Sequence, residues 1–342
     1  MTRVLALCGG VGGAKLAAGL ASVLPAADLT VVVNTGDDFE HLGLTICPDL
    51  DSTMYALAGV NDEQRGWGRR GESWDFMSAL EGLGGPTWFG LGDRDLATHV
   101  MRSHRLAQGV SLSQVTAQLA TALGIGCRLA PMSDHPVRTC VHTDEGPLGF
   151  QDYFVRLGCR PKVERLEYVG ATQAKLSRDL QAALSSSRLE CIVICPSNPW
   201  LSIDPILALP GLRFALRCCE VPIVAVSPIV AGRAIKGPAA DIMRALGYTV
   251  DATNIGRHYR NLIDLLVVDE QDAESNAAIE ALGIAPIRAP IVMKDEAARR
   301  RLAKTVLDAA DRWPGRAEHP AQKKVFGAVV PQDGAPVAPR SR

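Results

Sequence analysis

The opening of the chain constrains the fold more than any other stretch. Residues 3–8, RVLALC, form a short apolar run of strand character, and four glycines and a lysine follow in GGVGGAK. Residues 14–24, AKLAAGLASVL, have helical spacing, and residues 28–34, DLTVVVN, resemble a second buried strand. A strand, a helix and a strand in this order predict parallel strands joined by a right-handed crossover.

The same alternation returns in the second half of the chain, with apolar runs such as LECIVICP, VPIVAVSP and LLVVDE between helical segments. It predicts an α/β fold with a doubly wound, mostly parallel, Rossmann-like sheet. We expect residues 1–51 to be the first part of this core and residues 52–126, which lack strand signals, to be a helical insertion. Residues 127–315 complete the core and include a hairpin, and the Pro- and Ala-rich residues 316–342 are expected to be a flexible tail.

Charge and cysteine content indicate the kind of partner and compartment. The 342 residues carry a net charge of −1, so no overall field attracts nucleic acid or an anionic membrane. No apolar run approaches the length of a membrane span, and the glycine-rich start is unlike a signal peptide. Nine cysteines without zinc-ligand spacing indicate a reducing, cytoplasmic compartment.

The glycine-rich segment predicts a phosphate site. Gly10, Gly12 and Gly13 allow backbone amides to approach a phosphate closely, and the following helix adds positive potential. Lys15 adds a cation, but Leu16 follows it, so the segment is not a Walker A loop. A tight structural turn is the alternative explanation.

Four aspartates follow the second strand in VVNTGDDFEHLGLTICPDLDS. These acids, which need some positive partner, are Asp37, Asp38, Asp49 and Asp51. Carboxylates beside a phosphate loop are typical of Mg²⁺ held against a diphosphate. In the alternative interpretation, Asp51 caps a helix that starts at Ser52 and Asp49 lies in a proline-initiated turn.

A third segment, WFGLGDRDLATH, places an exposed glycine turn before a helix. Trp88 and Phe89 could line a pocket for a planar aromatic ligand, or they fill a core. Asp93, after Gly90 and Gly92, is either a site residue or an ordinary N-cap.

Two further loops follow predicted parallel strands, at the sheet edge where open α/β sheets bind ligands. Ser197 and Asn198 offer polar contacts in the first loop. In the second, Gly232 allows close approach while Arg233 and Lys236 neutralise a diphosphate. Together with the first glycine segment, these loops are predicted to converge on one crevice.

At this point a family resemblance is evident. GGVGGAK, NTGDDFEHLGLTICPDLDS, RGWGRRGESW, WFGLGDRDLATH, PSNPWLSI and SPIVAGRAIKGP occur in this order and spacing. From about residue 3 to 313 the chain strongly resembles the 2-phospholactate transferase family of coenzyme F420 biosynthesis, called CofD in archaea and FbiA in mycobacteria.

The resemblance implies a reaction. A guanosine diphosphate-activated three-carbon acid donates its phosphoacyl moiety to the terminal hydroxyl of the deazaflavin FO, and GMP leaves. It also implies Mg²⁺ dependence, a homodimer, and functional links to a guanylyltransferase and a glutamate ligase. The acid, whether phospholactate, phosphoenolpyruvate or 3-phosphoglycerate, is not identified by the sequence.

The resemblance assigns roles by position. It implies catalytic roles for Asp51, Asp37 and Lys15. It implies metal binding by Asp37, Asp38, Asp49 and Asp51, and nucleotide or phosphate binding by Gly10, Gly12, Gly13, Lys15, Ser197, Asn198, Pro199, Gly232, Arg233 and Lys236. It implies an FO site formed by Asp51, Trp88, Gly90 and Asp93; some archaeal relatives have lysine in place of Gly90.

Two rival functions remain open. The first is a nucleotide-sugar-binding regulator of the YvcK type, which shares the fold class but not the PDLDS context. The second is an NAD-dependent dehydrogenase, whose glycine fingerprint is broken by Lys15.

Overall fold

The computed structural model describes residues 3–235 and 237–315. A seven-stranded sheet forms its centre, and every neighbouring pair of strands in it is parallel. In spatial order its strands are β14 (Ala285–Arg288), β13 (Leu265–Val268), β10 (Ile223–Val226), β9 (Cys191–Ile194), β1 (Val4–Cys8), β2 (Leu29–Val33) and β5 (Arg128–Pro131). The predicted doubly wound α/β class is therefore confirmed.

Alternate residues of the strands pack into two separate cores, one on each face of the sheet. In β1, Leu5 and Leu7 belong to one core, whereas Val4, Ala6 and Cys8 belong to the other. Because both faces are covered, β1 reads as a continuous apolar run and not as an apolar–polar alternation, as expected for a parallel strand.

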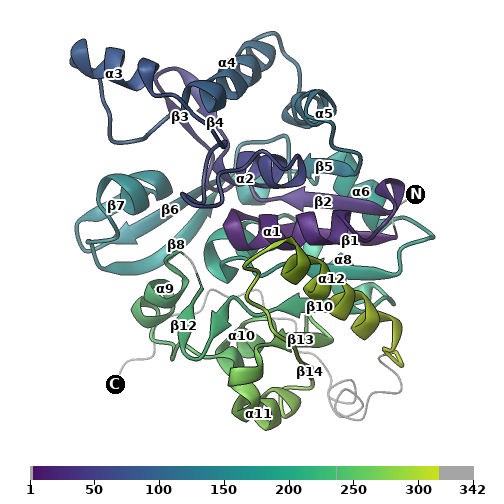
Figure 1. The fold of residues 1–342 in the computed structure, drawn as a ribbon. Helices are drawn as coiled ribbons and strands as arrows, with labels where there is room; N and C mark the ends of the chain where they lie inside the picture. Colours follow the sequence, from purple (N-terminus) through teal and green to yellow (C-terminus); the bar gives the residue numbers. More distant parts are fainter. Residues whose placement is uncertain (1–2, 236, 316–342) are drawn as a thin grey trace.

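Helices cover both faces (Figure 1). The face with Val4 and Cys8 is covered by α1 (Gly10–Ala21), α2 (Pro48–Leu57), α5 (Leu112–Ala122) and α12 (Glu296–Asp311). The opposite core contains residues of α6 (Arg178–Leu184), α7 (Asp204–Leu207), α8 (Leu212–Cys218), α9 (Ala239–Ala245), α10 (Ala252–His258) and α11 (Asn276–Glu280).

Smaller elements complete the described fold. Three antiparallel strands, in the order β7 (Gly146–Gly149), β6 (Arg138–Thr143) and β8 (Val163–Val169), contain the hairpin expected from the sequence. Two short hairpins pair β3 (Phe39–His41) with β4 (Leu44–Ile46), and β11 (Ile229–Val230) with β12 (Arg233–Ala234). The remaining short helices are η1 (Ala26–Asp28), η2 (Asp152–Arg156), η3 (Ala171–Gln173), η4 (Pro199–Ile203) and η5 (Glu270–Ser275).

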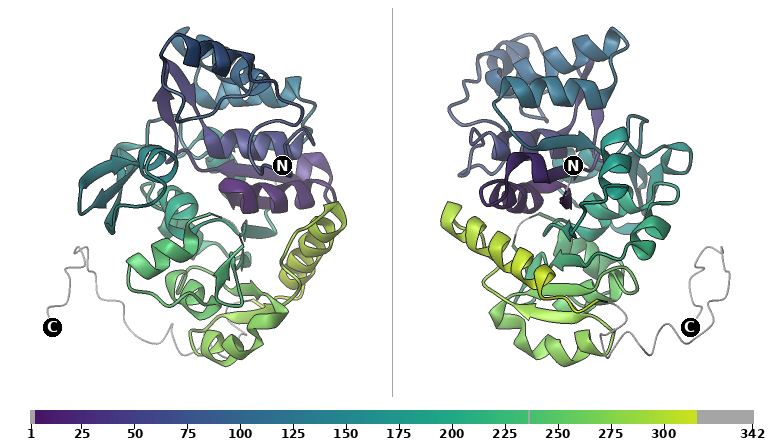
Figure 2. Two further views of the ribbon diagram at one scale, coloured as in Figure 1. Left: turned by 60° about the vertical axis from the view of Figure 1, so that its left-hand side comes forward. Right: turned by 90° about the vertical axis from the view of Figure 1, so that its right-hand side faces the viewer.

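The β3–β4 hairpin and the helices α3 (Asp75–Gly82), α4 (Asp93–Ala107) and α5 lie together at the β5 end of the sheet (Figures 1 and 2). The expected boundary between residues 51 and 52 falls inside α2, which packs against α1 in the core. The division into domains stays a prediction, and the expected tail at 316–342 lies outside the described residues.

The order in which strands are added to the sheet reverses between β1 and β9, because β2 lies on one side of β1 and β10 on the far side of β9. Such a switch point is where open α/β sheets bind ligands. Here α1 begins inside the glycine segment, with Gly9 as its N-cap, and not after it as the sequence suggested. A side chain on Gly12 would lie 2.3 Å from the Pro196 carbonyl oxygen, so glycine is needed for the close approach of α1 to the loop after β9.

Replacing Gly12 with alanine is expected to lower the free energy of unfolding by about 1–3 kcal/mol or more, because the backbone oxygen it meets cannot move aside cheaply. Gly82→Ala is the matched control, since that helical glycine has open space around it and gains helix propensity of up to about 1 kcal/mol. Urea unfolding of both variants without ligands would measure the difference. Equal stabilities would show that the contact at Gly12 is not restrictive.

Candidate active site

The residues after β1 and β9 meet at the switch point, as the sequence predicted for the glycine segment and the Ser197 loop. The Gly9 amide donates to Ser197 Oγ at 3.1 Å, and a side chain on Gly13 would lie 2.4 Å from the same oxygen. Asn198 caps η4 through its side-chain oxygen, which accepts from the Trp200 and Leu201 amides. Pro199, the first residue of η4, is buried.

Asp49 ties this region together. Its buried carboxylate accepts the Gly10 amide at 2.7 Å and the Asn34 side-chain amide at 3.0 Å, and it also bonds to Ser202. Burial raises the pKa of Asp49, although these hydrogen bonds oppose the shift. Asp49 lies in the first turn of α2, which begins at Pro48, but it satisfies an amide at the start of α1. The helix that Asp51 was expected to cap at Ser52 begins instead at Pro48, so both aspartates lie in its first turn, and it is Asp49 that caps another helix, α1.

Asp37 and Asp38 are buried between the β2 end and the β3–β4 hairpin. Oδ1 of each has no hydrogen-bond partner among the described residues. Burial, with repulsion from Asp49, raises the pKa of Asp37 well above its usual range. Burial also raises the pKa of Asp38 to about 7, despite the nearby Arg138 guanidinium and a hydrogen bond with Cys47. Unpartnered buried oxygens of this kind are costly and fit the ligand preference of a divalent cation.

Asp51 has a different environment. The buried guanidinium of Arg102, on α4, donates to both oxygens of its carboxylate, with Nη1 3.0 Å from Oδ2. His99 Nδ1 lies 3.5 Å from Asp51, and Asp95 lies on the far side of the same ring. Asp51, Asp95 and His99 are close enough together to hold a metal, but Arg102 already supplies positive charge there.

Lys15 and Arg233 have different environments in the structure. Lys15 Nζ donates to the Met293 carbonyl oxygen at 3.2 Å. Arg233 is exposed on the β11–β12 hairpin, whose turn has Ala231 and Gly232 at positive φ. Lys236 lies outside the described residues.

Two of the predicted FO residues, Trp88 and Gly90, lie beside different aromatic side chains. Trp88 lies within 6.0 Å, between ring centroids, of Phe39 and His41 on the β3 strand, so these three rings and Phe89 form one aromatic cluster. Gly90 faces Trp67 instead.

Asp93 is the first residue of α4 and not its N-cap, which is Gly92. Its carboxylate accepts the Asp75 and Phe76 amides at 3.1 Å each and so caps α3. In return, Glu72 accepts the Arg94 and Asp95 amides at the start of α4. Asp93 on α4 therefore caps α3, and Glu72, which precedes α3, caps α4. Asp93 has this structural role whether or not it also lies beside a ligand.

The sequence analysis missed Arg102, His99 and Arg138. A usable signal existed for two of them, because Asp95, His99 and Arg102 are spaced by four and three residues and therefore share a helix face. Arg138 comes from a distant strand, and no local pattern predicts its approach to Asp38.

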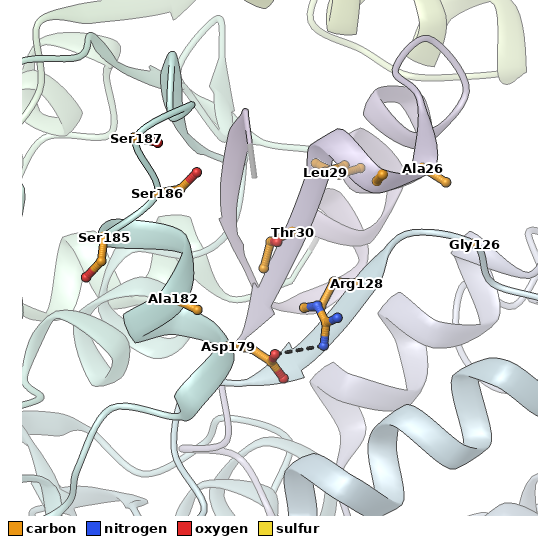
Figure 3. Close-up of a pocket in the computed structure, with 11 residues that line it drawn as sticks. Ala26, Leu29, Thr30, Gly126, Arg128, Asp179, Ala182, Ser185, Ser186 and Ser187 are labelled. Atoms are coloured by element: carbon orange, nitrogen blue, oxygen red, sulfur yellow. Dashed lines mark hydrogen bonds and ion pairs between the residues drawn. The ribbon is translucent and has the colours of Figure 1, made fainter. Parts of the chain in front are cut away.

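A cavity of about 610 Å³ lies elsewhere, at the amino ends of β2 and β5 (Figure 3). Its wall includes Thr30, Ser185 and the ion pair between Arg128 and Asp179, whose nitrogen and oxygen are 2.9 Å apart. None of the predicted site residues lines it, and it lies at the opposite strand ends from the glycine segment.

Comparison with known proteins identifies the family. The family model described as 2-phospho-L-lactate transferase CofD matches residues 4–308. The chain belongs to this family. A "Phosphoenolpyruvate transferase" of Kitasatospora aureofaciens is 43% identical, over 90% of this chain and 98% of its own length. A "2-phospho-L-lactate transferase" of Methanosarcina barkeri is 36% identical, over 89% and 97%.

As a member of the CofD family, the chain is a transferase. A solved structure from Bacillus halodurans, a member of the UPF0052 family, superposes with a TM-score of 0.59 at 15% identity, covering 90% of this chain and 98% of its own. At that identity the match shows the fold alone. No helix in the described residues has the length and apolar character needed to cross a membrane.

The raised pKa of Asp38 predicts a pH-dependent stability. Asp38 binds its proton more tightly in the folded state, where its pKa is about 7, than in the unfolded state, where its pKa is close to the ordinary value of 3.8. Its stabilising contribution is therefore full below pH 3.8 and is lost as pH rises toward 7. The free energy of unfolding of the wild type, relative to that of Asp38→Asn, should fall by a few kcal/mol between about pH 4.5 and 7, because one pKa unit corresponds to roughly 1.4 kcal/mol.

Urea midpoints of both proteins, measured in metal-free buffer, would test this. A constant difference across that range would show that Asp38 titrates normally.

Proposed function

We propose that this transferase moves a phospho-three-carbon-acid moiety from its guanylated form to the terminal hydroxyl of the deazaflavin FO, with Mg²⁺, in coenzyme F420 biosynthesis. A guanylyltransferase supplies the donor and a glutamate ligase consumes the product. The proposal includes a cytoplasmic homodimer that binds neither nucleic acid nor membrane.

The family match over residues 4–308 carries this proposal, because it includes every segment of the candidate site. The relatives quoted above are named for phospholactate and phosphoenolpyruvate. In this chain, the start of α1 beside Ser197 supports a diphosphate site, since helix N-termini favour anions.

We assign the four aspartates three different tasks. Asp37 and Asp38 each have an unpartnered buried oxygen and are our proposed metal ligands. Mg²⁺ bound there would offset negative charge on the diphosphate. Asp49 is already committed to Gly10 and Asn34, so we assign it a supporting role.

We propose that Asp51 contacts the hydroxyl group of FO that accepts the phosphoacyl group. The FO hydroxyl oxygen forms a new bond to the phosphorus of the phospho-acid, and the bond from that phosphorus to the bridging oxygen breaks. GMP leaves with the bridging oxygen and its electron pair, while the hydroxyl proton passes to Asp51 or to water. Positioning and charge neutralisation supply most of the rate enhancement in such transfers.

Purified protein incubated with FO, GTP, Mg²⁺, a guanylyltransferase and one acid at a time should give product with the mass of FO plus that phosphoacyl group, and GMP. Phospholactate, phosphoenolpyruvate and 3-phosphoglycerate form the separate arms. Binding of a UDP-sugar with no product in any arm would favour the regulator instead. Reduction of a nicotinamide cofactor would favour the dehydrogenase.

Asp37→Asn should raise the Mg²⁺ concentration needed for half-maximal rate by about tenfold or more, since it removes a charged ligand. It should leave thermal stability equal or higher without metal, because the variant no longer buries a charge beside Asp49. Asp134→Asn, an exposed acid elsewhere, is the control. An unchanged Mg²⁺ requirement in Asp37→Asn would contradict metal binding by Asp37.

A further inference from the structure

Arg102 is a buried cation whose position is unusually well defined. Only 1% of it is exposed, and it reaches from α4 to α2. Its Nη1 and Nη2 donate to the two oxygens of Asp51, and Nη1 also lies 3.4 Å from the Thr45 carbonyl oxygen. Burial alone lowers the pKa of Arg102, but the Asp51 carboxylate outweighs it and raises that pKa. The two side chains therefore form a bidentate pair, in which the guanidinium and carboxylate planes are held together.

His99 lies one turn before Arg102 on α4 and contacts its guanidinium. Nη1 of Arg102 lies 3.2 Å from His99 Nδ1, which accepts its hydrogen because the guanidinium can only donate. Nε2 of that ring lies 3.3 Å from Asp95 Oδ1 but makes no hydrogen bond with a described residue. Asp95 is held in turn by the Tyr55 hydroxyl at 2.6 Å.

Tyr55 lies on α2, as Asp51 does, so the chain of contacts leaves α2, crosses α4 and returns. Burial alone raises the pKa of Asp95, but His99, Tyr55 and Arg102 outweigh it and lower that pKa. The network therefore contains two carboxyl groups, one guanidinium and one imidazole, all of them buried. Breaking one member leaves others buried without their partners, which makes the arrangement cooperative.

We propose that Arg102 is a positioning residue for the Asp51 carboxylate and that His99 holds Arg102 in that role. This rests on the proposed function, in which Asp51 meets the acceptor hydroxyl. Each carboxylate oxygen has two lone-pair directions, and a guanidinium fork uses one on each. The fork thus fixes the carboxylate plane and leaves one defined direction on each oxygen for the acceptor.

Arg102→Lys tests the fork, because lysine keeps the charge but cannot make two parallel hydrogen bonds. We expect kcat to fall by about 30- to 100-fold, as a displacement of about 1 Å in a reacting group can produce. KM for donor and acceptor should change by less than about threefold, because neither is bound by Arg102. A kcat within threefold of wild type, in protein shown to be folded by circular dichroism, would overturn the proposal.

His99→Asn and His99→Leu form a matched pair for the second contact. Asparagine places an oxygen near the position of Nδ1 and can accept from Arg102, whereas leucine cannot. We expect kcat to stay within about threefold for asparagine and to fall about tenfold or more for leucine, with both proteins assayed below their unfolding temperatures. Equal losses in both variants would show that His99 only fills space.

A double-mutant cycle separates positioning from independent structural effects. If Arg102 acts through Asp51, Arg102→Lys should cost almost nothing in kcat once Asp51→Asn is present. Full additivity of the two losses would overturn the proposal. Wild type measured in parallel separates the two hypotheses: without product from any guanylated acid the proposed function fails, whereas normal wild-type turnover with an active Arg102→Lys defeats only the role of Arg102.

Discussion

One carboxylate, that of Asp49, connects the ends of three strands. It accepts the Gly10 amide after β1 and the Asn34 amide after β2, and it bonds to Ser202 after β9. Asn34 also donates to the Leu201 carbonyl oxygen, which lies 167 residues farther along the chain. Because the acid is buried, each of these contacts replaces a lost hydrogen bond to water, and the strand ends cannot separate without exposing it. These contacts therefore hold the strand ends together without any ligand.

Around this anchor the remaining acids differ in how their charge is balanced. Asp51 is neutralised within the chain by Arg102, whereas Asp37 and Asp38 retain oxygens with no hydrogen-bond partner among the described residues. Burying a carboxylate without a partner is costly, and such groups are found where function demands them. The same short segment thus contains an anchor, an acid paired with an arginine, and two acids with unpartnered oxygens.

The helices beyond β5 contribute to this arrangement and do not merely cover it. Asp93 and Glu72 fix α3 and α4 against each other through reciprocal capping, and α4 then presents Arg102 and His99 to α2. Movement of α4 would therefore move the partner of Asp51. These contacts link α3 and α4 to the helix α2, which packs on the sheet.

The doubly wound sheet could be predicted from the sequence alone, because strand and helix periodicities and the glycine segment are local signals that depend on neighbouring residues. The sequence also predicted that the loops containing Gly10 and Ser197 would meet, since parallel strand ends share one edge. The partners and the pKa of each acid, in contrast, follow from tertiary packing. Asp49 caps a helix 39 residues away and Asp51 pairs with an arginine 51 residues away, and burial raises the pKa of Asp38. Desolvation and long-range pairing depend on which segments pack together, and no local pattern encodes that.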